Sequence, residues 1–278
     1  MNGLRRSVTT LAGALAAGLA AALAVAAPVV ACAQIAVLSS TVEEKIAAPG
    51  EKYSGAIVVS NPSAQPQIAR IYQTDYRFAS DGTAHYDEPG TTTRSNAPWI
   101  TPQASRIVIP AHSQVSVPYS IVVPTADSLR GTYWSMIMVE GVPVEPAPSS
   151  ANAKPAVAIG AVMRYAIQLA THIRNTGTRT VQFASPSAVK AANGSASLDI
   201  DMTDTGERAF RPTLWVEVYD AQGALKAKAK QTRGLLYPGT SLHQHFDLGM
   251  LPSGTYKAVI FADTGEDAVF ATQYTINY

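Results

Sequence analysis

The sequence predicts an all-β protein made of two tandem immunoglobulin-like β-sandwich domains that follow an N-terminal signal peptide. Three observations support this prediction. Short apolar runs alternate with turn residues from residue 34 onward, at the spacing of roughly 8 to 12 residues that is typical of sandwich folds. One pattern of residues occurs twice in the chain. The first 33 residues differ in composition from the rest, being rich in alanine, leucine and valine.

Residues 1–33 have the plan of a secretory signal peptide. Arg5 and Arg6 precede a long apolar run, which ends in the small-x-small sequence Ala31-Cys32-Ala33. We expect cleavage before Gln34, which removes the only cysteine, so the mature chain has no disulfide and no membrane span. Two alternatives stay open. The run is long enough for an uncleaved anchor, since about 18 apolar residues can cross a bilayer, and "VVAC" is similar to a lipoprotein box with Cys32 as the lipidated residue.

The repeated pattern predicts two related domains, residues 34–173 and 174–278. Pro110, Ser113 and Pro124 have equally spaced counterparts at Pro238, Ser241 and Pro252, and each set is followed by Gly-Thr-Tyr. In immunoglobulin-like sandwiches, a tyrosine near the start of the sixth strand folds its hydroxyl back onto upstream backbone. The sequence therefore predicts structural corners at Tyr133 and Tyr256.

Alternating residues predict which strand faces are buried. In "SQVSVPYSIVVP" one face is apolar, whereas "GAIVVSN" has apolar residues on both faces, Ala56 and Val58 against Ile57 and Val59. In the second domain, Trp215 alternates with Glu217 rather than with its apolar neighbours, so its burial stays open. A proline-rich loop precedes a long apolar strand over 157–173.

We find no motif of an enzyme. The chain lacks a Gly-x-Ser-x-Gly elbow, a His-Glu-x-x-His helix, a glycine loop for phosphate and a cysteine cluster, so we expect no catalytic residue and no cofactor. The net charge of the whole chain is +1, which does not indicate nucleic acid as a partner.

Two segments contain residues that often bind metals. His243 and His245 share a strand face, but no third ligand is evident in the sequence. "DIDMTDTGE" at 199–207 fails the spacing of a calcium loop, which needs glycine at the sixth position, where Asp204 stands, and a closing glutamate at the twelfth. We therefore expect solvent-exposed histidines, a strand with outward carboxylates followed by a turn, and no metal site.

The first domain resembles periplasmic pilus-assembly (fimbrial) chaperones over residues 35–172. The resemblance rests on "GAIVVSNPSAQP", "RIVIPAHSQVSVPYSIV", "GTYWSMIMVEGVPVEP" and the long strand "AVAIGAVMRYAIQL". It implies that this seventh strand is donated to an incomplete subunit by strand addition. The donated row would be Val157, Ile159, Ala161, Met163, Tyr165 and Ile167.

The same resemblance implies that two basic residues anchor the subunit's terminal carboxylate, one on the first strand and one on the seventh. Arg164 matches the seventh-strand position, whereas the first strand offers Glu43, Glu44 and only Lys45. The second domain looks more like a generic extracellular immunoglobulin or fibronectin type III module.

Two functions follow as hypotheses for an exported, non-enzymatic protein of the periplasm or cell surface. The first is a chaperone-like protein that binds a surface or pilus subunit by strand addition. The alternative is a structural or adhesive module that binds protein or glycan through end loops such as 79–98. For the long apolar strand, an internal strand that links the domains is as good an interpretation as donation.

Overall fold

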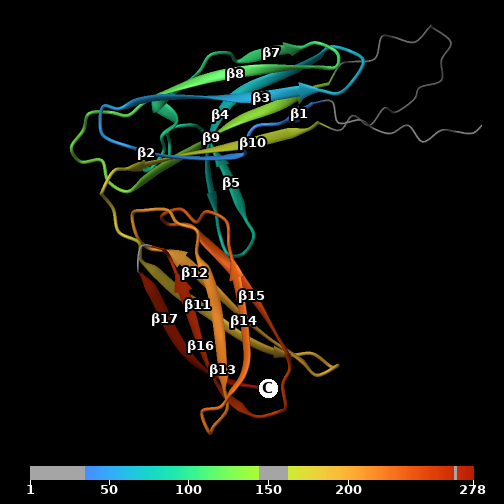
Figure 1. Cartoon of the computed structure of the whole chain (residues 1–278), viewed down its shortest axis with the longest axis vertical. Coiled ribbons are helices and arrows are strands. Elements are labelled where there is room, and N and C mark those ends of the chain that lie inside the picture. Colours follow the sequence, from blue (N-terminus) through green and yellow to red (C-terminus); the bar gives the residue numbers. More distant parts are fainter. Residues whose placement is uncertain (1–34, 144–161, 266–267) are drawn as a thin grey trace, which may run out of the picture. The chain divides into compact units, whose positions relative to one another are not determined.

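The computed structural model describes residues 35–143, 162–265 and 268–278 (Figure 1). They form two β-sandwiches, as the alternation of apolar runs and turns predicts. The predicted signal peptide lies outside the described residues. Among the described residues, no helix is long and apolar enough to cross a bilayer; the helix found there is the short 3-10 turn η1 (Ala97–Trp99).

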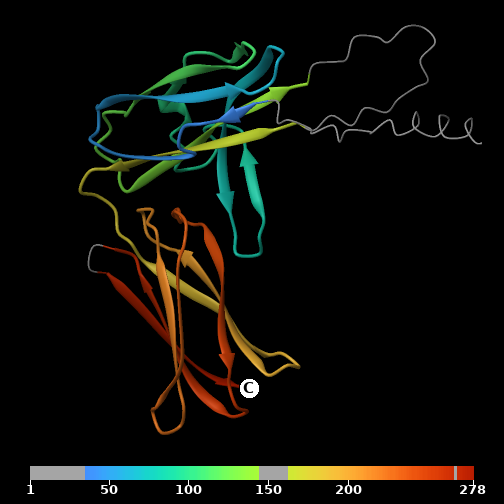
Figure 2. The same cartoon turned by 45° about the vertical axis from the view of Figure 1, so that its right-hand side comes forward.

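The first sandwich contains two sheets. One has the strand order β1-β3-β8-β6, and the other has the order β2-β10-β9-β4-β5, with β7 pairing to β4. β4 and β5 form a hairpin that extends beyond the rest of their sheet (Figure 2). The bounds are β1 (Ala36–Val37), β2 (Val42–Ala47), β3 (Lys52–Asn61), β4 (Gln67–Phe78), β5 (Ala84–Asp87), β6 (Ile100–Pro102), β7 (Arg106–Ile109), β8 (Ser113–Val122), β9 (Thr132–Val142) and β10 (Arg164–Ile173).

The second sandwich also contains two sheets. Their orders are β11-β12-β15 and β14-β13-β16-β17, and all their neighbouring strands are antiparallel. The bounds are β11 (Val181–Lys190), β12 (Ser195–Asp204), β13 (Thr213–Tyr219), β14 (Leu225–Thr232), β15 (Ser241–Met250), β16 (Thr255–Asp263) and β17 (Val269–Asn277).

Each sandwich has its own apolar core, built from alternate residues of facing strands. On β3 the question left open by the sequence is decided in favour of Ile57 and Val59, which are fully buried. On β13 the core takes Leu214 and Val216, while Trp215 points away from it and stacks on Phe261 of β16, with ring centroids 4.8 Å apart.

Candidate partner-binding edge

β10 lies between two strands for only part of its length. It pairs antiparallel with β9 from Arg164 to His172, but it pairs with the parallel strand β2 only from Gln168 to Ile173. Within the described part of the chain, residues 164–167 therefore have no strand on the side away from β9. This open half of β10 contains Tyr165 and Ile167, the last two residues of the donated row that the sequence predicts. The other half is an internal strand. Donation by the first half stays a prediction.

Backbone hydrogen bonds show which groups point to the open side. Gly141 N–H donates to the Met163 carbonyl at 2.9 Å, so the backbone groups of Met163 point to β9. Gln168 N–H donates to the Thr41 carbonyl at 2.8 Å on the opposite side. Because these groups alternate along a strand, the N–H and C=O of Arg164 and Ala166 face the open side, where an added strand could bind them.

A groove of about 480 Å³ lies next to this open edge. Ala166 and the buried Met138 contribute apolar surface to it, while the exposed Tyr86 comes from β5. A volume of this size is in the usual range for small-molecule and side-chain pockets. The other lining residues are Tyr72, Gln73, Thr74, Asp87, Glu88, Pro89 and Arg164.

Arg164 is already paired with a carboxylate. Its guanidinium binds Glu140 on β9 at 2.7 Å, directly across the ladder. Glu140 also accepts a hydrogen bond from the Tyr72 hydroxyl at 2.8 Å. The Tyr72 hydrogen bond and the Arg164 guanidinium together lower the pKa of Glu140. In this structure the positive charge of Arg164 is therefore engaged within the sheet.

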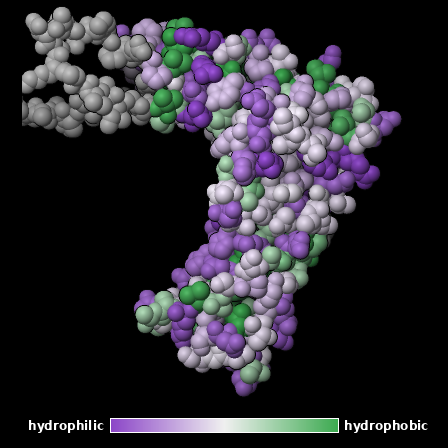
Figure 3. Space-filling model, turned by 180° about the vertical axis from the view of Figure 1, so that it is seen from behind, coloured by the Kyte–Doolittle hydropathy of each residue, from purple (hydrophilic) through white to green (hydrophobic). Residues whose placement is uncertain are grey.

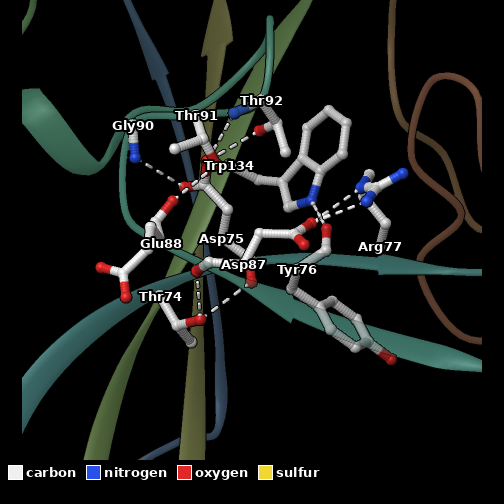
Figure 4. Close-up of polar contacts among 10 residues, drawn as sticks. All are labelled: Thr74, Asp75, Tyr76, Arg77, Asp87, Glu88, Gly90, Thr91, Thr92 and Trp134. Atoms are coloured by element: carbon white, nitrogen blue, oxygen red, sulfur yellow. Dashed lines mark hydrogen bonds and ion pairs between the residues drawn. The ribbon is translucent and has the colours of Figure 1, made fainter.

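The wall of the groove formed by β5 and the loop after it is anchored by a buried carboxylate (Figure 4). Asp75 on β4 has no exposed surface. Its two oxygens accept hydrogen bonds from the backbone N–H groups of Gly90 and Thr92 at 3.2 and 2.8 Å. The hydroxyls of Thr92 and Ser95 add two more. A buried charge needs such donors, and their effect is to tie the loop to β4.

The predicted partner-binding residues fall in different places. Val157, Ile159 and Ala161 lie outside the described residues. Met163 is 37% exposed just before β10. Tyr165 is half-buried, and its hydroxyl donates to the Ile35 carbonyl at 3.0 Å.

Ile167 is fully buried in the core of the first sandwich. Odd-numbered residues of β10 point into this core, so in this structure Ile167 is not available to fill a groove of another protein. The surface offered at the open edge instead belongs to Arg164 and Ala166, a face that the sequence had not singled out apart from Arg164.

On β2, which contains Glu43, Glu44 and Lys45, an acidic residue makes the contacts with basic groups. Glu44 on β2 lies 3.2 Å from the His172 imidazole and forms an ion pair with Arg211. The hydrogen bond from His172, followed by that from Arg211, lowers the pKa of Glu44 although burial opposes this shift. Lys45 is exposed.

The two predicted tyrosine corners differ. The Tyr256 hydroxyl donates to the Pro252 carbonyl at 2.9 Å, four residues upstream, which is the expected corner. Tyr133 instead packs its ring on Trp99 at a centroid distance of 4.8 Å and under the Arg94 guanidinium. Within the described residues, the structure assigns the Tyr133 hydroxyl no hydrogen bond to upstream backbone.

His243 and His245 are exposed on β15, and each is hydrogen-bonded to an aspartate of β12, Asp201 and Asp199 respectively. The described residues contain no group of three or more histidine, cysteine, aspartate or glutamate side chains that could hold a metal ion. Asp204 does not face solvent as the sequence suggested. It is fully buried at the end of β12, and burial raises its pKa to about 7.

Solved structures similar to this chain include fimbrial chaperones. A chaperone–tip adhesin complex of CFA/I fimbriae has a TM-score of 0.46 and 11% identity, over 86% of this chain and 97% of that one. The class 5 fimbriae chaperone CfaA has a TM-score of 0.44 and 12% identity, over 86% and 98%. The CsuC–CsuE chaperone–tip subunit complex of Acinetobacter baumannii has a TM-score of 0.42 and 10% identity, over 76% and 89%. These similarities concern the fold. No protein-family model and no curated protein sequence matches the chain.

Proposed function

We propose that this chain is a non-enzymatic periplasmic protein that holds a subunit of a surface or pilus structure by β-strand addition. The observation that supports this function most directly is the open edge of β10, where the backbone groups of Arg164 and Ala166 have no partner strand within the described residues. Added strands gain affinity from such backbone groups and selectivity from side-chain pockets beside them. The groove that contains Met138 supplies a pocket of this kind.

On one side of the molecule, the surface agrees with binding through a strand edge rather than through a broad apolar face (Figure 3). On the side drawn in Figure 3, hydrophobic side chains occur in small separate groups among hydrophilic ones. Partner recognition through a broad apolar face would need a larger continuous patch. Export through a signal peptide cleaved after residue 33, and the division into domains at 173/174, are parts of the same proposal.

Affinity purification from the native envelope tests the proposal. We would compare the wild type with Ala166→Pro and Ala166→Ser. Proline removes the N–H that faces the open side and is tolerated at sheet edges, whereas serine keeps that N–H. We expect the wild type and Ala166→Ser to capture one small β-rich subunit and Ala166→Pro to lose it. Ile159→Asp would test the predicted donated row in the same assay.

Circular dichroism of each variant provides the control for folding. If a folded Ala166→Pro variant captures the subunit as well as the wild type, strand addition at this edge is wrong. If the folded wild type captures no subunit, the chaperone-like function is wrong. Either result would favour the alternative, a structural or adhesive module that binds through end loops such as 79–98.

A further inference from the structure

Three of the four edge strands of the second sandwich carry features that prevent pairing with another strand. β14 presents a row of lysines, and charged residues on an edge are a common protection against strand pairing. β11 contains Pro186, which has no N–H, and its ladder shifts register at this point. The ladder of β15 also shifts register near its end. The lysines of β14 are Lys226, Lys228 and Lys230. β15 contains the polar residues His243 and His245 and the charged residue Asp247.

The fourth edge strand, β17, has none of these features. Its sequence VFATQYTIN contains no charged residue and no proline, and it pairs with β16 without a register shift. It is rich in residues that favour strands. Within the described residues, no strand pairs with its other side. An edge strand that is long, regular and uncharged is a template for another strand.

The direction of the free backbone groups follows from the end of the strand. Gly254 and Tyr278 exchange two hydrogen bonds, at 2.9 and 3.0 Å. Even-numbered residues of β17 therefore direct their N–H and C=O to β16. The odd-numbered residues direct theirs away from it, and their side chains lie on the face away from the core, which takes Ile276. The outward donors and acceptors belong to Val269, Ala271, Gln273, Thr275 and Asn277.

We propose that β17 pairs with β17 of a second copy of this chain, antiparallel and about a two-fold axis. Identical strands pair in this way through the same surface on both copies. Full overlap places Gln273 opposite Gln273, with Ala271 opposite Thr275 and Val269 opposite Asn277. Each of these pairs joins two residues whose backbone groups face outward, so each can exchange two hydrogen bonds. None of these pairs brings two like charges together. The same pairing of two β14 strands would bring lysines together.

Sedimentation velocity of the purified chain over a range of concentrations tests the proposal. We expect a concentration-dependent dimer for the wild type and for Gln273→Thr, which stays uncharged and keeps a residue suited to strands. Gln273→Lys and Gln273→Glu each place two like charges at the two-fold axis. We expect their dissociation constants to rise by about tenfold or more.

Mixing Gln273→Lys with Gln273→Glu supplies the sharper test. Opposite charges then meet at the axis, so the equimolar mixture should form a heterodimer at concentrations where each variant alone dimerises only weakly. A wild type that stays monomeric at every concentration would overturn the proposal. So would a dimer that Gln273→Lys leaves unchanged, since that dimer must use another surface. Neither result depends on the subunit-binding edge of β10, whose test uses Ala166.

Discussion

The two Gly-Thr-Tyr segments begin corresponding strands, β9 and β16, yet their residues make different contacts. In the second copy the contacts are local: Tyr256 closes the corner on Pro252. Thr255 is exposed and bonds to Asn277. Gly254 has room for a side chain, because a Cβ there would make only ordinary contact with the Tyr256 ring, at 3.7 Å or more.

In the first copy the same three residues lie against segments distant in the sequence. Gly131 has a positive φ of 71°, and a Cβ there would lie 1.9 Å from the Glu207 carbonyl oxygen. Thr132 N–H donates to that same carbonyl at 2.8 Å. The Thr132 hydroxyl accepts from Ala209 N–H at 2.9 Å. The first copy therefore forms hydrogen bonds with the loop after β12, whereas the second forms hydrogen bonds only within its own sandwich.

A repeated motif can therefore keep its place in a fold while its contribution to stability changes. The tripeptide begins a strand in both sandwiches, but of the two glycines only Gly131 has a positive φ that favours glycine. What the side chains then do depends on which neighbours reach that end of the sandwich. Matched substitutions in the two copies should therefore have unequal effects on stability.

Alanine at the two glycines should give the largest difference. Gly131→Ala forces a Cβ against backbone at a positive φ, and we expect a loss of about 4 kcal/mol in the free energy of unfolding. Gly254→Ala meets only ordinary contacts, and we expect a change of about 0.5 kcal/mol or less. Urea denaturation of both variants checks this. Equal losses would contradict the comparison.

The Asp-Thr-Gly turns that follow β12 and β16 extend the comparison. Asp204 and Asp263 each accept a hydrogen bond at 2.8 Å from the glycine two residues on. Burial raises the pKa of Asp204 to about 7 from a usual value of 3.8. A carboxyl group whose pKa is raised in the folded state holds its proton more tightly there. Its contribution to stability is therefore fully present below about pH 4 and is lost as the pH rises toward 7.

Asp204→Asn removes this titration. We expect the variant and the wild type to be similarly stable at pH 4, and the variant to be about 2 to 3 kcal/mol more stable at pH 8. Asp263→Asn is the matched control at the other turn, where the aspartate is only half-buried. Denaturation curves at the two pH values measure both. A pH-independent difference between Asp204→Asn and the wild type would contradict the expectation.

Valine at the two threonines should have a smaller effect. Thr132→Val keeps the shape of the side chain but leaves the buried Ala209 N–H without its acceptor. An unsatisfied buried donor costs about 2 kcal/mol. Thr255→Val removes an exposed hydrogen bond and should change stability by about 0.5 kcal/mol or less. The same denaturation assay compares them, and a larger loss for Thr255→Val would reverse the comparison.

Local alternation was enough to predict the all-β fold and several buried faces. On β8, Val117, Tyr119 and Ile121 are buried as their pattern indicates, and so is Val123 just after the strand. On β3 the pattern could not decide, because both faces are apolar and only the facing sheet selects Ile57. The outward position of Trp215 follows its alternation with Glu217, once the alternation is weighted above the general tendency of tryptophan to be buried.

Features that depend on pairing between distant strands could not be predicted. The Arg164–Glu140 ion pair arises from the β9–β10 register across a long connection. The burial of Asp204 and the four donors around Asp75 depend on loops that close from elsewhere in the chain. The open edge at Arg164 depends on where β2 begins, because Val42 pairs with Gln168, and no local pattern of residues marks that point.

Phenylalanine at the two tyrosines should give the smallest difference and the most specific one. Tyr256→Phe removes only the hydroxyl that donates to the Pro252 carbonyl, and a single hydrogen bond of this kind contributes about 1 kcal/mol. The Tyr133 ring packs on Trp99, and phenylalanine keeps that packing, so Tyr133→Phe should leave the free energy of unfolding nearly unchanged. If the Tyr133 hydroxyl formed a corner hydrogen bond in solution, Tyr133→Phe and Tyr256→Phe would instead lose the same free energy of unfolding. The comparison therefore separates a tyrosine that closes a corner from one that only packs, although both stand in the same tripeptide.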